Sequence, residues 1–299
     1  MSAVTRIAGA RNATTPPQFK RRRRRMRPAS VAIFIGVAFL LVFELYPLVW
    51  LFLSSFKTQN EFTTEPVWSL PATFGWANYE QAFTTGNIAQ YALNSVLTVF
   101  PALIFIVILG VAGAFALEVM VWKGRGGVLL YFLAGIMVPA QMILLPLFNA
   151  YFRTGLSGTL WPLIITYTAL GLPLTVFLLA TFFRAIPREI FEAATIDGAN
   201  IYRLLFSIGI PMIRNAIATV LLVQFFFLWN DLLIAYTFTT SAKLRTIQVG
   251  LLAFNGQYGS VQWGPLFAAI CVNVFGTLVI YLVLNKQIMK GLTAGSVKG

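Results

Sequence analysis

Long apolar stretches separated by short polar segments make up most of the chain after residue 30. Each stretch reaches the roughly 20 residues that an α-helix needs to cross the hydrocarbon core of a bilayer. Apolar residues surround most of each helix and show no alternation with period two, which indicates spanning helices and not barrel strands. The prediction is an all-α polytopic membrane protein with six transmembrane helices: Val31–Leu53, Asn94–Met120, Val128–Phe152, Leu160–Phe183, Pro211–Ala235 and Pro265–Leu284.

Composition supports this fold class. Hydrophobic residues make up 58% of the 299 residues and charged residues 10%, with a mean hydropathy of +0.79. Soluble domains have about 25% charged residues, so an ordinary soluble domain is excluded. The first span follows a basic run, as a signal peptide would. It is too long for a signal peptide and no small-residue cleavage site follows it, so it is interpreted as a retained signal anchor.

The positive charges predict the topology. The net charge is +13, from 22 Lys and Arg against 9 Asp and Glu. With both termini in the cytoplasm, 18 cations lie inside and only Lys57, Arg153, Lys243 and Arg245 outside, as the positive-inside rule requires. By pattern alone, Arg21–Arg25 is either a nucleic-acid patch or a topology anchor with affinity for anionic lipid. Its place before the first span favours the anchor, so residues 1–29 are expected to be a basic flexible tail with membrane lipid, and no nucleic acid, as partner.

Several chemistries lack the residues they need. The chain has no His, and its single cysteine, Cys271, lies in an apolar run. Imidazole catalysis, a zinc site and a disulfide within the chain are therefore excluded. The segment Gly124–Gly127 is rich in glycine but lacks the Lys and the strand of a phosphate-binding loop. No catalytic residue, metal site or cofactor is expected, and any ATP is expected to bind a different chain.

Prolines and carboxylates mark unusual positions within the spans. Interior prolines bend helices and are tolerated where helices surround a cavity, although proline is also common in membrane helices generally. These prolines are Pro101, Pro139, Pro146, Pro162 and Pro173. Glu44 and Asp231, with its neighbour Asn230, are candidate pathway residues, because an ionised acid within a span is expected to face protein or water. Hydration at the outer interface remains the alternative for Asp231, and snorkelling or hydrogen bonding between helices remains the alternative for Glu44.

The cytoplasmic segment 187–211 is polar enough to leave the membrane and is patterned for two short helices. Pro187 suits the first position of a helix, and Gly198 is expected to end that helix. Apolar residues then recur every three to four positions from Ile201, which predicts a second amphipathic helix that Pro211 limits. Small residues on this helix–glycine–helix elbow would let a partner approach closely.

The elbow also carries a family signature. It reads Glu192-Ala193-Ala194, three residues, Gly198, nine residues, then Ile208-Gly209-Ile210-Pro211. This resembles the signature of permease subunits of binding-protein-dependent ABC importers, with Ile in place of one Leu. The C-terminal residues 291–299, Trp229-Asn230-Asp231 and the segment 255–259 resemble the six-span, maltose-type carbohydrate permease. This second resemblance covers most of the chain after residue 30.

The resemblance implies a type I importer permease domain over residues 30–290 and an ATPase-contacting tail over 291–299. The implied partners are a second, different permease, two copies of an ATP-binding subunit that holds ATP and Mg, and an extracytoplasmic sugar-binding protein. The implied location is the plasma membrane of a bacterium or archaeon. The implied coupling residues are Glu192, Ala193, Ala194, Asp197, Gly198, Ile208 and Pro211. The tail would contact the ATPase through Thr293, Ala294, Gly295 and Lys298, and the binding protein would meet Phe254, Asn255, Gly256, Gln257 and Tyr258.

The expected function is therefore that of the permease of an ATP-driven sugar importer, without enzymatic activity of its own. The alternative is a secondary transporter or channel that works alone. That alternative predicts internal repeats and charges at the membrane midplane, and the chain shows no clear repeat.

Overall fold

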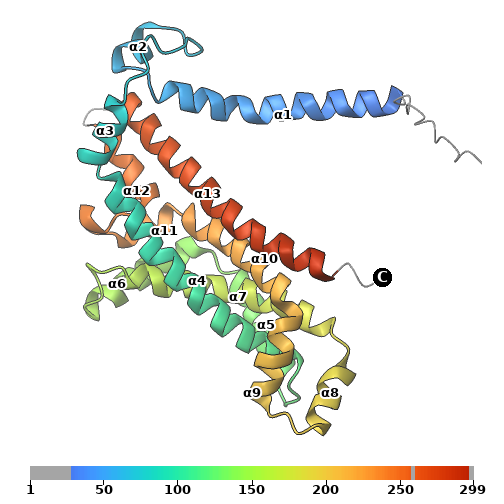
Figure 1. The fold of residues 1–299 in the computed structure, drawn as a ribbon. Coiled ribbons are helices and arrows are strands. Elements are labelled where there is room, and N and C mark those ends of the chain that lie inside the picture. The colour runs from blue at the N-terminus through green and yellow to red at the C-terminus, as the bar shows by residue number, and fades with distance from the viewer. Residues whose placement is uncertain (1–27, 257–259, 296–299) are drawn as a thin grey trace, which may run out of the picture. The chain divides into compact units, whose positions relative to one another are not determined.

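The computed structural model describes residues 28–256 and 260–295, and most of these residues are helical (Figure 1). The expected all-α architecture is confirmed. The chain forms two units, Met1–Leu48 and Val49–Gly299, which are described separately. The α-helices are α1 (Pro28–Ser54), α2 (Gln59–Thr64), α3 (Ala77–Thr84), α4 (Ile88–Glu118), α5 (Arg125–Ile136), α6 (Ala140–Arg153), α7 (Trp161–Arg184), α8 (Arg188–Ile196), α9 (Ile201–Arg203), α10 (Ile210–Trp229), α11 (Leu233–Phe238), α12 (Ile247–Leu251) and α13 (Trp263–Gly295).

Among the described residues, five helical segments are long and apolar enough to cross a membrane. These are Ile33–Ser54, Ile88–Glu118, Trp161–Arg184, Ile201–Trp229 and Trp263–Val283. Each corresponds to a predicted span, with shifted ends. The largest shift is in the fifth span, which begins at Ile201 where the sequence predicted Pro211. Helix α13 matches the last span and continues beyond it to Gly295.

The third predicted span is not one continuous helix. Its residues form α5 and α6, which meet at 95°. The break lies at Met137–Pro139, where Pro139 is extended, with ψ 128°, and precedes the first residue of α6. A proline disfavours helical geometry in the residue before it, and this explains the break. The bend expected at Pro139 is thus confirmed, whereas Pro101 and Pro173 lie inside continuous helices.

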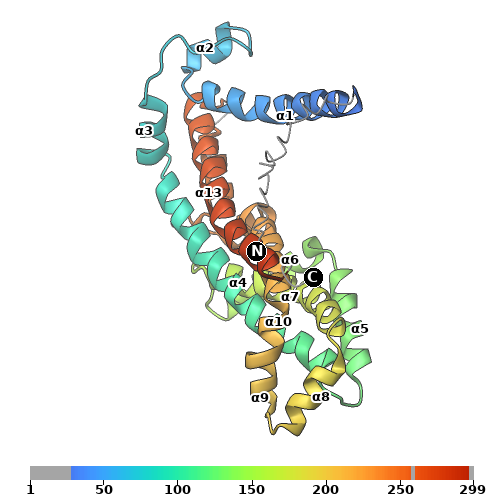
Figure 2. The same ribbon diagram turned by 45° about the vertical axis from the view of Figure 1, so that its right-hand side comes forward.

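The bent pair completes a sixth crossing. The last residues of α4 and α7, Glu118 and Arg184, form an ion pair, so these two helices end on the same side. The chain between them must therefore return to the other side before α7 begins. Consistent with this, Tyr151 of α6 hydrogen bonds to Thr166 in the first half of α7, with 2.9 Å between the two hydroxyl oxygens. We call the side with α8 and α9 the elbow side and the side with α2 and α3 the opposite side (Figures 1 and 2).

The fifth predicted span ends earlier than expected. Helix α10 stops at Trp229, and Asn230–Leu232 separate it from α11, so the expected end at Ala235 is wrong. Asp231 explains the interruption. Its Oδ2 accepts a hydrogen bond from the backbone N–H of Ala235 at 2.9 Å and thereby caps the start of α11. The same oxygen accepts a hydrogen bond from the hydroxyl of Tyr167 at 2.9 Å, which fixes the break against α7.

Helices α4 and α7 pack closely because glycines lie between them. A methyl group on Gly110 would lie 2.5 Å from Thr175 Cγ2, and one on Gly171 would lie 2.6 Å from Ile106 Cδ1. Gln224 of α10 joins this interface, since its Nε2 donates to the carbonyl of Gly171 and to the hydroxyl of Thr175, both at 3.1 Å. Small residues that let helix backbones approach are typical of packing in membranes.

The opposite side is covered by a segment that contains α2 and α3. Thr58 and Glu61 form a capping box at the start of α2. The second carboxylate oxygen of Glu61 accepts the backbone N–H of Ala72 at 2.7 Å. These hydrogen bonds stabilise the charged carboxylate and so lower the pKa of Glu61 below its ordinary value of 4.5. The bond from Ala72 has the largest effect, and those from Thr58 follow. One ionised side chain therefore holds both α2 and the loop that follows it.

Replacing Gly110 by leucine tests the α4–α7 contact. We expect Gly110→Leu to lower the thermal unfolding midpoint of the purified protein, because overpacking a close helix contact costs about 1–3 kcal/mol. Gly276→Leu is the matched control, since Gly276 lies in α13 with no atom within 4 Å of an added methyl group. Equal midpoints for the two variants would contradict the close packing.

Acid should release the loop that Glu61 holds. A carboxylate whose pKa is lowered on folding stabilises the fold above its unfolded pKa, and this contribution is lost as the pH falls through the folded value. We therefore expect hydrogen-exchange protection of the Ala72 amide, corrected for intrinsic exchange, to persist at pH 4.5 and to fall below it. Glu61→Gln should reduce this protection at neutral pH and remove its acid dependence. An acid dependence that persists in Glu61→Gln would refute the assignment.

Candidate functional site: the elbow

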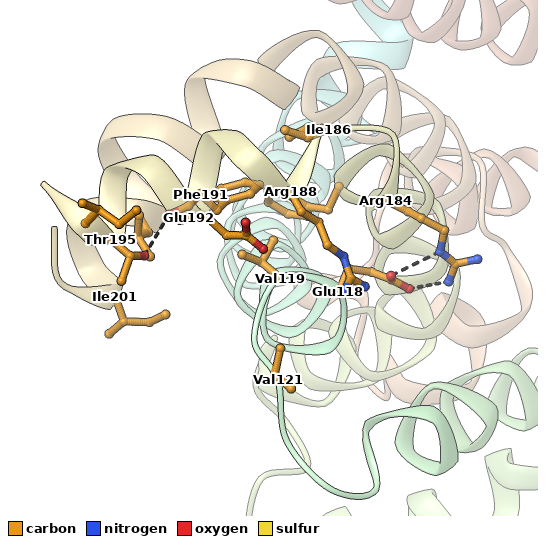
Figure 3. A pocket seen from close by; sticks show the side chains of 13 residues that line it. Glu118, Val119, Val121, Arg184, Ile186, Arg188, Phe191, Glu192, Thr195 and Ile201 are labelled. Carbon is orange, nitrogen blue, oxygen red and sulfur yellow. Dashed lines mark hydrogen bonds and ion pairs between the residues drawn. The ribbon is translucent and has the colours of Figure 1, made fainter. Parts of the chain in front are cut away.

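The candidate site lies at the segment that carries the signature, where α7 ends and α8 and α9 follow (Figure 3). Helix α8 begins at Arg188, with the extended residue Pro187 immediately before it. Pro187 therefore immediately precedes the helix, whereas the sequence predicted that it would occupy the first helical position. The helix–glycine–helix order itself is confirmed, because α8 ends at Ile196 and α9 begins at Ile201.

Gly198 ends α8 for a backbone reason. Its φ is +80°, in the left-handed region that residues with a Cβ adopt only at an energetic cost. The N–H of Gly198 donates to the carbonyl of Thr195 at 3.0 Å, and that of Ala199 donates to Ala194 at 2.9 Å. This pair of bonds is the Schellman arrangement that satisfies the last carbonyls of a helix. The glycine of the signature is thus required by the turn.

Phe191 attaches α8 to the membrane helices. Its side chain is 7% exposed and packs edge-on against Phe115 of α4, with 6.2 Å between ring centroids. Phe115 in turn packs against Phe183 of α7 at 5.6 Å. Leu204, which follows α9, is buried in the same hydrophobic cluster. The apolar face of the elbow therefore rests on the ends of α4 and α7.

The second helix of the elbow does not end at Pro211, contrary to the prediction. Asn200 caps α9 by accepting the N–H of Arg203 at 2.9 Å, and a π-helix, Leu204–Gly209, then leads directly into α10. The N–H of Ile210 donates to Leu205, five residues earlier. This wider turn accommodates Pro211, which has no N–H and lies in the first turn of α10, where proline is tolerated. The elbow is consequently continuous with a membrane span.

The signature residues divide into exposed and supporting positions. Glu192, Ala193, Asp197 and Gly198 are exposed, while Ala194 is half-buried against the core. An added methyl group on Gly198 would meet no atom within 4 Å. The structure thus brings four of the signature residues together on an accessible surface. Ile208 is half-buried, and Pro211 is exposed at the base of α10.

A cavity of about 360 Å³ lies between α8 and the ends of α4 and α7. Figure 3 shows the ion pair on its wall, in which both oxygens of Glu118 accept hydrogen bonds from Arg184. The Nε contact measures 3.2 Å, and the side chain of Glu118 is 12% exposed against 62% for Arg184. From the sequence, Glu118 and Arg184 are only two of the charges in segments predicted to lie inside the cell. A sequence signal for the ion pair did exist: an acidic and a basic residue lie at the ends of two different spans, on the same predicted side of the membrane.

The predicted binding-protein loop is only partly accessible. Phe254 is 2% exposed and belongs to the core, where its ring lies against Gly86. Its side chain therefore holds the loop in place, and Asn255 and Gly256 are exposed. Gln257 and Tyr258 lie outside the described residues, as does Lys298 of the predicted tail. The last turns of α13 contain Thr293, Ala294 and Gly295. Contact of these residues with an ATPase stays a prediction.

The candidate pathway residues have different surroundings. Asn230 Nδ2 donates to the carbonyl of Phe226 at 3.0 Å, and Asp231 is half-buried and caps α11. Asp231 thus has a structural role that the sequence did not indicate. Glu44 lies on α1 in the first unit, and a pathway role for all three residues stays a prediction. In the described part of the chain, no group of three or more Cys, Asp or Glu is placed to hold a metal ion.

Residues 109–287, which include the elbow, match the model of the family "Binding-protein-dependent transport system inner membrane component". The chain belongs to this family. This membership places it in the plasma membrane as a multi-pass permease subunit. The resemblance carried by Glu192-Ala193-Ala194 and Gly198 is thereby confirmed.

Individual permeases of known systems align over most of the chain. The chain is 36% identical to the diacetylchitobiose uptake system permease protein NgcG of Streptomyces coelicolor, over 85% of this chain and 84% of that protein. It is 30% identical to the sulfoquinovosyl glycerol transport system permease protein SmoH of Agrobacterium fabrum, over 89% and 93% respectively. The fold matches a chain of a bacterial ABC transporter involved in alginate import, with a TM-score of 0.72, 21% identity, and coverage of 87% and 98%.

A charge exchange tests the ion pair in this permease. We expect Glu118→Gln and Arg184→Gln each to destabilise the protein by up to about 1 kcal/mol, because one partner is largely exposed. The double variant Glu118→Arg with Arg184→Glu should recover part of the loss, which thermal unfolding at low and high salt would measure. A double variant less stable than both single variants would show that the two charges do not act as a pair.

Proposed function

We propose that this permease carries a sugar, an oligosaccharide or a sugar derivative through the membrane, driven by ATP hydrolysis on a separate chain. Support for the substrate class comes from the relatives, whose names specify diacetylchitobiose and sulfoquinovosyl glycerol. The resemblance of residues 229–231 and 255–259 to the maltose-type subfamily points the same way. The chain itself is proposed to have no enzymatic activity.

The elbow is proposed to dock into a groove of the ATP-hydrolysing subunit. The observation that carries this proposal is the exposed left-handed turn at Gly198, beside Ala193 and Glu192, on a helix anchored by buried Phe191. Small exposed residues let a partner surface come close, while Phe191 and Leu204 connect the docked helix to α4, α7 and α10. Movement of the ATPase would then rotate these spans as rigid bodies and alternate access to the pathway.

The remaining partners follow from the same proposal. A second permease subunit completes the pathway, two ATPase copies contact the two elbows, and an extracytoplasmic binding protein delivers the sugar near Asn255 and Gly256. The elbow side, and with it both termini, faces the cytoplasm. Support for this orientation is the charge distribution, in which 18 of 22 cations lie in the segments assigned to the cytoplasm.

Bulk at the glycine of the elbow tests the docking. We expect Gly198→Trp to remain in the membrane but to lose sugar uptake and co-purification of the ATPase, because the indole occupies the space reserved for the partner. Gly198→Ala separates backbone strain from bulk. Alanine adds only a methyl group, so this variant shows the effect of placing a residue with a Cβ in left-handed geometry, which costs about 1 kcal/mol of stability.

The matched control is Gly126→Trp. Gly126 lies in the first turn of α5, outside the elbow segment 187–211, with no atom within 4 Å of an added methyl group. It should retain uptake and ATPase co-purification. Normal uptake by Gly198→Trp would overturn the proposed docking, and a stable homomer that transports without any ATPase would favour a solitary transporter.

A further inference from the structure

Residues 66–76, here called the Trp68 loop, expose five large apolar side chains outside the spans. Each of these side chains is between 65% and 76% exposed, and they belong to Val67, Trp68, Leu70, Phe74 and Trp76. The sequence from Pro66 to Tyr79 contains no charged residue. An apolar surface of this kind on a loop indicates a binding surface.

Two contacts fix the depth of the Trp68 loop. The carbonyl of Val67 accepts a hydrogen bond from Trp50 Nε1 at 3.0 Å, and Trp50 lies four residues before the end of the span Ile33–Ser54. At 1.5 Å per residue, this is about 6 Å inside the end of the helix. The ring of Trp50 also packs against Phe267, which lies in the first turns of α13, with 5.3 Å between centroids. The loop therefore lies beside the terminal turns of two spans and does not project away from them.

Several polar groups of the loop have hydrogen-bond partners within the protein. The buried ammonium of Lys57 donates to the carbonyl of Val67 at 3.3 Å and to Ser69 Oγ at 3.0 Å. The N–H of Ser69 donates to Pro66 at 3.0 Å, which forms a turn with Val67 and Trp68 at its tip. The N–H of Ala72 donates to Glu61. A segment that enters the lipid boundary needs such internal partners for its backbone.

We propose that the Trp68 loop is an interfacial anchor, which inserts Trp68 and Leu70 into the phospholipid headgroup region on the opposite side from the elbow. Tryptophan is enriched at this depth because its ring is amphipathic. Another tryptophan lies nearby, because Trp263 is the first residue of α13 and its backbone N–H donates to Gln59 of α2. The depth of the loop, its lack of charge and its hydrogen bonds within the protein all favour lipid over another protein as the occupant.

The anchor would also brace the loop predicted to meet a binding protein. Gln59 at the start of α2 donates through Nε2 to the carbonyl of Val261 at 2.9 Å, and its Oε1 accepts the N–H of Trp263 at 3.0 Å. Insertion of the Trp68 loop would therefore hold α2 at a fixed distance from the bilayer. Through the hydrogen bonds of Gln59, it would hold Val261, the last residue of the segment 255–261, at a fixed distance as well.

Spin labels at single cysteines test the anchor. The full chain, purified with the subunits that accompany it, carries Cys271→Ser and either Trp68→Cys or Leu70→Cys, in vesicles of phosphatidylethanolamine and phosphatidylglycerol. Thr63→Cys is the control, because Thr63 is exposed on α2 in the same segment. Electron paramagnetic resonance then measures collisions of each label with oxygen, which enters lipid, and with a water-soluble nickel chelate.

We expect the ratio of oxygen to nickel collisions at positions 68 and 70 to be several-fold higher than at position 63. Either position suffices, so a variant that fails to fold does not leave the proposal untested. Equal ratios at the three positions would place the loop in water and overturn the anchor. Protection from both reagents at 68 and 70 would mean that a protein partner covers the loop, which would also overturn it.

Discussion

The close contact between α4 and α7 determines much of the site described above. Gly110 and Gly171 leave room for Thr175 and Ile106, so the two helices lie near each other along their length. Because they are close, their last residues Glu118 and Arg184 come within hydrogen-bonding distance, and Phe115 meets Phe183. These aromatic rings form the surface on which Phe191 of α8 rests. The orientation of the elbow therefore depends on Gly110 and Gly171, because only residues without a side chain let α4 and α7 approach this closely.

The elbow combines a rigid attachment with an accessible turn. Phe191 and Leu204 are buried, whereas Glu192, Ala193 and Gly198 are exposed within the same segment. Under the proposed docking, a force on the exposed turn would reach the spans through packed aromatic rings, because a close-packed interior deforms little. The π-helix Leu204–Gly209 continues directly into α10, so no flexible linker separates the turn from a membrane span. This continuity makes the segment suited to transmit force into the membrane.

The two ends of the second unit have different chemistry. The elbow end exposes small and charged side chains that suit a protein partner. The opposite end exposes aromatic side chains, while Lys57 and Glu61 are buried and bond to the loop backbone. Burying a charge is costly unless hydrogen bonds compensate, and here the charged groups hold the loop that carries the exposed aromatic surface. A transport cycle that moves the elbow end would act against an opposite end held by these contacts.

The sequence by itself determined the membrane class, the approximate location of the spans and the helix–glycine–helix order of the elbow. These features depend on local properties: apolar length, helix-stopping glycine and the spacing of one signature. Only the tertiary structure decided which prolines interrupt a span. The chain bends at Pro139, whereas Pro101 and Pro173 stay inside helices and Pro211 follows a wide turn that accommodates it. It also decided that Glu118 meets Arg184, that Asp231 caps α11 and that Phe254 is buried. Such contacts join residues far apart in the sequence or depend on local backbone geometry, so neither hydropathy nor motif spacing contains them.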